Sequence, residues 1–172
     1  MPRHTNLRRF QEALAERLRS AARTERAVWL GMEAGAHRYL LRLEDAGEVL
    51  PLPDITPVPL TRPWFVGLAN VRGKLVSVAD LAAFLGESPA PRSPQSRLVL
   101  FAERFGTQGG VVVNRMLGLK TARGLERREV RAPHAWIGAL FVNREDNGLE
   151  REWRELHVGA LLKNEGFLQA GL

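Results

Sequence analysis

The sequence predicts a mainly β fold, either a small barrel or a sandwich, preceded by one helix. After residue 26, apolar residues alternate over runs only a few residues long, as in strands with one buried face. The chain contains sixteen glycines and ten prolines. Many of them fall between these runs, where glycine and proline mark turns. The 172 residues suit one ordinary domain or two very small lobes that share an interface.

An amphipathic helix is predicted over residues 1–26. Leu7, Phe10, Leu14 and Leu18 recur at spacings of three and four after a possible cap at Thr5 or Asn6, which places them on one helix face. This segment holds seven arginines against three glutamates. We favour a solvated helix lying on the body of the protein, with a membrane-surface helix or a basic arm as the alternatives.

The first strands are predicted within residues 27–43, where two alternating apolar runs flank Gly35. Residues 49–59 contain four prolines, which exclude a helix and an interior strand, so we expect an extended surface segment. Residues 65–71 and 74–78 form two more runs around the turn Arg72-Gly73. Asp80 is placed to cap a short helix that ends at Gly86, before a loop over residues 87–96.

The second half repeats this pattern. Short apolar runs at residues 98–102 and 110–113 flank a turn near Gly106, and a further pair at 136–142 and 151–156 flanks a polar turn. Residues 158–163 suit a last helical turn, with Phe167 and Leu168 folding back onto the body. Close spacing of short strands favours a barrel or sandwich over a parallel α/β sheet.

Composition excludes several classes of protein. The absence of cysteine excludes thiol catalysis, zinc knuckles, iron–sulfur clusters and a disulfide framework. No run reaches the roughly 18 apolar residues of a membrane span, so we expect a soluble protein of a reducing compartment. The four histidines lie far apart, and the sequence contains no nucleophile elbow and no phosphate-binding loop. We therefore predict no catalytic residue, no metal ligand and no cofactor.

A nucleic-acid-binding barrel is the alternative that the net charge of +6 suggests. Arg123, Arg127, Arg128 and Arg131 cluster within nine residues, as a phosphate-binding group would. Two glutamates interrupt this cluster, and no aromatic residues are interleaved for base stacking. A solvated, partly self-paired charged run is the simpler interpretation.

The densest stretch resembles the signature of the CheW-like domain family. Residues 55–59 read I-T-P-V-P, and residues 67–81 read G-L-A-N-V-R-G-K-L-V-S-V-A-D-L. The family pattern is I-T-x-V-P, a gap, and G-x-x-N-L-R-G-x-x-x-P-V-x-D-L. Two departures stand out: Ser77 replaces the usual proline, and Asn114 replaces the aspartate of a later G-x-x-V-D strand. The resemblance spans residues 27–168.

This resemblance implies two five-stranded, SH3-like barrels packed together. It also implies a non-enzymatic, cytoplasmic adaptor that joins a CheA-type histidine kinase to the tip of a methyl-accepting receptor in membrane-proximal arrays. Residues 49–53, the pair Pro63-Trp64 and residues 80–86 are similar to the branch that controls type IV pili and twitching motility. A regulatory domain split from a histidine kinase would share the fold and is a second alternative.

The resemblance also carries over candidate partner-binding residues. Arg72 is the foremost, because a guanidinium on a turn offers five hydrogen-bond donors, and it is accompanied by Asn70, Val71 and Gly73. For Arg72 the alternative is an ordinary solvent-facing turn residue, and for Asn70 a bond that holds the turn.

Four further candidates match positions of the groove between the two lobes that the family uses for receptor contact. They are Gly67, Gly110, Met116 and Leu119. For Met116 and Leu119, packing in the core is an equally good interpretation.

Overall fold

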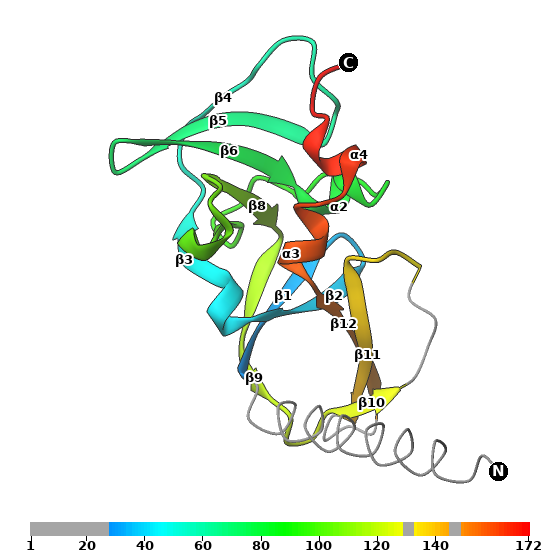
Figure 1. Ribbon diagram of the computed structural model, residues 1–172. Coiled ribbons are helices and arrows are strands. Elements are labelled where there is room, and N and C mark those ends of the chain that lie inside the picture. Colours follow the sequence, from blue (N-terminus) through cyan, green and yellow to red (C-terminus); the bar gives the residue numbers. More distant parts are fainter. Residues whose placement is uncertain (1–27, 129–132, 145–148) are drawn as a thin grey trace, which may run out of the picture.

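The computed structural model describes residues 28–128, 133–144 and 149–172. Within these ranges the chain forms two six-stranded sheets, one above the other (Figure 1). We name them sheet A, the lower one, and sheet B, the upper one. The helix expected over residues 1–26 lies outside the described residues.

Sheet A is built from both ends of the described chain, and sheet B from its middle. The strand order in sheet A is β10 (Glu126–Arg128), β11 (Ile137–Arg144), β12 (Glu150–Leu156), β2 (His37–Arg42), β1 (Val28–Ala34) and β9 (Arg115–Thr121). The order in sheet B is β3 (Ala46–Pro51), β7 (Arg97–Phe101), β8 (Gly109–Val113), β6 (Lys74–Asp80), β5 (Phe65–Val71) and β4 (Ile55–Thr56). The pairs β12–β2 and β6–β8 are parallel, and the other neighbouring strands are antiparallel.

Short helical segments join the strands. The α-helices are α2 (Leu81–Phe84), α3 (Val158–Leu161) and α4 (Glu165–Leu168), and the 3-10 helices are Leu43–Asp45 and Glu103–Phe105. Asp80 caps α2 as expected, because its Oδ1 accepts a hydrogen bond of 2.9 Å from the Ala83 amide. Among the described residues, no helix is long and apolar enough to cross a membrane.

The prediction of a mainly β fold is confirmed. Each sheet has six strands, whereas the family resemblance implied five strands in each barrel. The proline-rich segment is more regular than expected, since it contributes β3 and β4. Both strands lie at edges of sheet B, where a proline removes no hydrogen bond of the sheet interior. In sheet A, β9 and β10 fall where no strand was expected.

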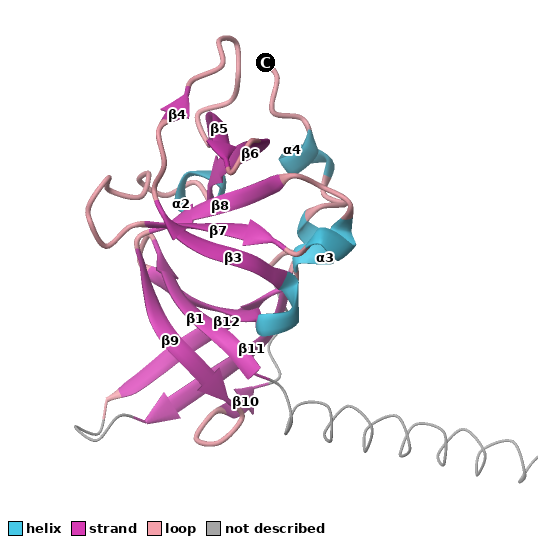
Figure 2. Cartoon of the chain, turned by 90° about the vertical axis from the view of Figure 1, so that its left-hand side faces the viewer, coloured by secondary structure: helices cyan, strands magenta, loops and turns pink. Residues whose placement is uncertain are grey.

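The largest hydrophobic core lies between the two sheets. Sheet A contributes buried residues such as Met32 and Leu41, and sheet B contributes Val99, Phe101 and Val111. Each sheet also encloses a smaller core of its own. Figure 2 shows the two sheets from the side, with α3 beside the junction. Because burying each such side chain contributes roughly 1.5–3 kcal/mol, the sheet–sheet contact stabilises the two lobes as one unit.

An aromatic cluster closes one side of this junction. Trp64 stacks on Phe167 of α4, with ring centroids 5.4 Å apart and planes 11° apart. Phe84 of α2 meets Trp64 edge-on at 5.3 Å and Trp136, which precedes β11, at 5.5 Å. Trp64 is buried, and Phe167 folds back onto it, as expected.

Candidate partner-binding surfaces

The β5–β6 hairpin ends in a tight two-residue turn. Val71 pairs with Lys74, and between them Arg72 and Gly73 have φ angles of 52° and 82°. Positive φ at both central residues is the geometry of a type I′ turn, which matches the twist of the flanking strands. Asn70 Oδ1 accepts a 2.8 Å hydrogen bond from the Gly73 amide, so Asn70 holds the turn.

Arg72 lies at the tip of this hairpin. One of its terminal nitrogens lies 2.6 Å from Glu48 Oε1 on β3, the strand at one edge of sheet B. The Arg72 side chain is nevertheless 79% exposed, so most of its donors face solvent. Next to it, Lys74 pairs with Glu103 at 3.0 Å, and Leu75 is 60% exposed. The tip therefore combines an oriented guanidinium with an exposed apolar side chain.

Gly67 and Gly110 lie inside sheet B rather than on its surface. Gly67 has φ 141°, and a Cβ atom there would lie 2.1 Å from the Thr56 carbonyl oxygen of β4. At Gly110 a Cβ atom would lie 2.6 Å from the Val99 carbonyl oxygen of β7. Both glycines thus allow strands to approach closely, and neither has a side chain to offer a partner.

We expect Gly67→Ala to destabilise the protein by about 2–3 kcal/mol, because the left-handed backbone and the contact with Thr56 both oppose a methyl group. The matched variant Gly73→Ala shares a positive φ but meets no atom within 4 Å, and should cost only about 1 kcal/mol. Urea unfolding of both variants measures the difference. Equal losses would contradict the packing role assigned to Gly67.

Met116 and Leu119 lie on the edge strand β9. They pair with Met32 and Leu30 of β1, respectively, and both of these side chains contact the core between the sheets. Met116 packs against that core, while Leu119 is 62% exposed. Met116 therefore lies beside the junction of the two sheets, and Leu119 is a solvent-exposed residue further along the same edge strand. Both lie in sheet A, apart from the two glycines of sheet B.

The two departures from the family pattern have local explanations. Ser77 donates its backbone N–H to the Gln108 carbonyl at 3.0 Å, a bond that a proline could not make. Asn114 Oδ1 accepts a 3.1 Å hydrogen bond from the Gly35 amide, in the turn between β1 and β2. Both residues thus connect neighbouring segments.

The arginine cluster of the second half is partly self-paired. Arg128 lies on β10 and forms an ion pair of 3.2 Å with Glu150, which also pairs with Arg144 at 3.3 Å. Arg123 and Arg127 are exposed, and Arg131 lies outside the described residues. This arrangement agrees with a solvated charged surface.

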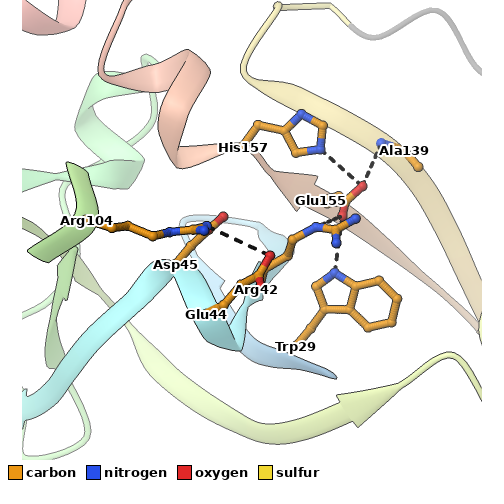
Figure 3. Close-up of polar contacts among 8 residues, drawn as sticks. All are labelled: Trp29, Arg42, Glu44, Asp45, Arg104, Ala139, Glu155 and His157. Atoms are coloured by element: carbon orange, nitrogen blue, oxygen red, sulfur yellow. Dashed lines mark hydrogen bonds and ion pairs between the residues drawn. The ribbon is translucent and has the colours of Figure 1, made fainter. Parts of the chain in front are cut away.

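A buried polar cluster inside sheet A has no counterpart in the sequence-based predictions (Figure 3). Glu155 of β12 is 5% exposed and accepts hydrogen bonds from Trp29 Nε1 at 3.3 Å and Arg42 Nε at 3.2 Å. His157 Nε2 lies 3.3 Å from the other carboxylate oxygen. Nearby, Arg104 binds Asp45 between the sheets and approaches Glu44 at 3.9 Å.

The environment of Glu155 favours its charged form. Burial alone would raise its pKa, but the hydrogen bond and charge of His157, the charge of Arg42 and the hydrogen bond from Trp29 outweigh burial. Together they lower the pKa of Glu155 from 4.5 to about 2. The carboxylate thus joins β1, β2 and β12 as a structural hub.

Comparison with known proteins places the chain in a family. The model of the CheW-like domain matches residues 29–132. The chain is 34% identical over 149 residues to the protein PilI of Pseudomonas aeruginosa, which covers 83% of this chain and 79% of PilI. It is 35% identical over 90 residues to the chemotaxis protein CheW of Thermotoga maritima, covering 52% of this chain and 58% of that protein.

A solved structure shares the fold. The scaffolding protein TtCheW from Thermoanaerobacter tengcongensis superposes with a TM-score of 0.64 at 20% identity, over 81% of this chain and 94% of that one. The fold, the motif around Arg72 and the sequence matches agree. This chain belongs to the CheW-like domain family.

Proposed function

We propose that this protein is a non-enzymatic coupling scaffold that links methyl-accepting receptors to a CheA-type histidine kinase. By its likeness to PilI, we assign it to the cytoplasmic chemosensory system of type IV pili, with its place in receptor arrays. The observation that carries this proposal is the presentation of Arg72 at the tip of the β5–β6 hairpin.

Arg72 occupies a position that a type I′ turn normally gives to glycine, asparagine or aspartate. Its φ of 52° costs about 1–2 kcal/mol for a residue with a Cβ atom. Backbone strain of this kind is typical of functional sites. Glu48 orients the guanidinium in advance, which reduces the entropy lost when a partner binds. An arginine anchor of this kind suits the centre of a protein interface.

A coupling protein needs a second surface, and β9 offers one. Leu119 is an exposed apolar side chain on a sheet edge that pairs with no further strand of the described residues, a combination that monomeric proteins normally protect. Arg72 lies on sheet B and Leu119 on sheet A, so two partners can contact different lobes. The shared core between the sheets would then transmit a receptor change through differential contacts in two states.

The first test measures how tightly the variant Arg72→Glu binds the kinase and the receptor. We expect the affinity for the kinase or the receptor fragment to fall at least about tenfold, because the variant removes the guanidinium donors and reverses the charge that faces the partner. The melting temperature should stay nearly unchanged, since an exposed charge swap alters the free energy of unfolding by about 0.5 kcal/mol. Co-purification and calorimetry with kinase and receptor fragments of the same organism measure both.

Two controls separate recognition from hairpin geometry. Arg127→Glu changes an exposed arginine of sheet A and should leave binding intact. The double variant Glu48→Arg/Arg72→Glu restores the ion pair with the two charges exchanged between the positions. Failure of the double variant to recover binding is expected if Arg72 itself contacts the partner, whereas full recovery would show that the ion pair only positions the hairpin. Wild-type binding by Arg72→Glu would overturn the assignment.

A further inference from the structure

A concave site lies on sheet B, at the end of β5 and β6 that is remote from the hairpin tip. It is a pocket of about 260 Å³ between the extended segment that precedes β5 and the loop that follows α2. Its walls include Leu52, Ile55, Phe65, Val66 and Val112. Since Arg72 and Leu119 are not among its lining residues, the pocket is separate from both surfaces of the proposed coupling function.

The pocket is an opening in the small core of sheet B. Val112 is buried in that core, while Leu52, Ile55 and Val66 pack against it and remain partly exposed. The core therefore continues to the surface as a concave apolar floor. An apolar side chain placed here would lose its water-exposed area in the same way as a residue of the core.

The wall formed by the loop is held in place. Asp80 is buried, and its Oδ2 accepts a 2.8 Å hydrogen bond from the amide of Ala90, which lines the pocket. Its Oδ1 accepts from the Ala83 amide, so both carboxylate oxygens are used. Further along the loop, Ser96 Oγ donates to the Pro91 carbonyl. A wall fixed in this way costs little ordering entropy when a ligand binds.

Arg92 supplies a charge at this site. Its side chain is exposed and lines the pocket, and it forms no hydrogen bond or ion pair with any residue that the structure describes. The carboxylate of Asp80 is engaged by two amides, so the guanidinium is the group that remains available to a ligand. Arginine binds a carboxylate through parallel hydrogen bonds.

We propose that this pocket binds a peptide segment of a protein partner through one apolar side chain, leucine or phenylalanine, flanked by an acidic residue that pairs with Arg92. The volume supports this class of ligand, because sites for small molecules usually measure roughly 300–1,000 Å³. A smaller pocket suits one or two side chains. The proposal concerns a different surface from that of Arg72 and does not depend on the coupling function.

The test is an NMR titration of the full chain with two acetylated tetrapeptide amides, Glu-Leu-Phe-Glu and Lys-Leu-Phe-Lys. We expect the acidic peptide to give saturable shifts at the methyl groups of Ile55, Val66 and Val112. The lysine-flanked peptide should bind about tenfold more weakly, because it places cations beside Arg92. Arg92→Glu should reverse this preference, which is a gain of binding that an unfolded variant could not show.

Two further variants complete the experiment. Leu52→Trp fills the pocket and should abolish shifts from both peptides, with circular dichroism confirming its fold. Arg123→Glu alters an exposed arginine in the turn between β9 and β10 and should change neither titration. Equal binding of the two peptides, an unchanged preference in Arg92→Glu, or shifts that avoid the pocket methyls would each overturn the proposal.

Discussion

Replacing Glu155 with alanine is expected to lower the free energy of unfolding by about 3–5 kcal/mol. The substitution leaves the buried Trp29 indole N–H without its acceptor and Arg42 without its counter-charge. Removal of one partner from a buried charged network is costly because the remaining groups stay desolvated. Urea unfolding at neutral pH measures the loss directly.

Glu152 on the same strand provides a matched control. Its side chain is about half exposed and pairs with Arg154 at 3.3 Å, so Glu152→Ala should change the free energy of unfolding by no more than about 1 kcal/mol. Similar losses in the two alanine variants would contradict the role of Glu155 as the hub of sheet A.

The same residue predicts a dependence of stability on pH. The pKa of Glu155 is about 2 in the folded protein, below its ordinary value, so its ionised form stabilises the folded state above about pH 4.5. This contribution, about 3 kcal/mol, is lost as the pH falls from 4.5 towards 2. Glu155→Gln should therefore lose less stability than the wild type over that range. An equal loss of the free energy of unfolding between pH 4.5 and pH 2 in the two proteins would contradict this assignment.

Replacing Trp64 with alanine is expected to cost about 3–5 kcal/mol as well. The variant opens a cavity among Phe84, Phe167 and Phe65, and it removes the ring that stacks on α4. We also expect faster amide hydrogen exchange in α4, because this single-turn helix depends on tertiary contacts rather than on its length.

Trp64→Phe is the matched control for this prediction. A phenyl ring preserves part of the stacking on Phe167, so this variant should retain more than half of the stability that alanine loses. Urea unfolding and hydrogen exchange of both variants provide the measurements. If α4 exchanges at the wild-type rate in Trp64→Ala, the cluster does not hold the C-terminal segment in place.

Most strands could be predicted because the features that specify them lie close together along the chain. The run from Phe65 to Val71, its turn and the cap at Asp80 follow from alternation, turn chemistry and capping within about 20 residues. The strand β9 was missed because it lies at a sheet edge, where its side chains do not alternate between buried and exposed. The strand β10 consists of three exposed charged residues and carries no apolar pattern at all.

The candidate site was predicted in part. The motif indicated Arg72, and alternation and turn chemistry predicted the turn that carries it, but the partner Glu48 comes from another strand, 24 residues away. Gly67 lies in the motif, and Gly110 lies on β8, which pairs with β6 of the motif. Only the packing of the strands reveals that both glycines make room for neighbouring backbone. Such contacts depend on which strands become neighbours, which local patterns do not specify.

Some features of this molecule follow from its sequence alone, whereas others arise only when the strands assemble. The all-β character, the hairpin with Arg72 and the absence of thiol chemistry follow from residue types and their spacing along the chain. The position of the main core and the role of Glu155 depend on assembly. Strands such as β7 and β8 are apolar on both faces, so alternation cannot say which face meets the other sheet. Likewise, Glu155 becomes a buried hub because Arg42 and Trp29 approach it from 113 and 126 residues away.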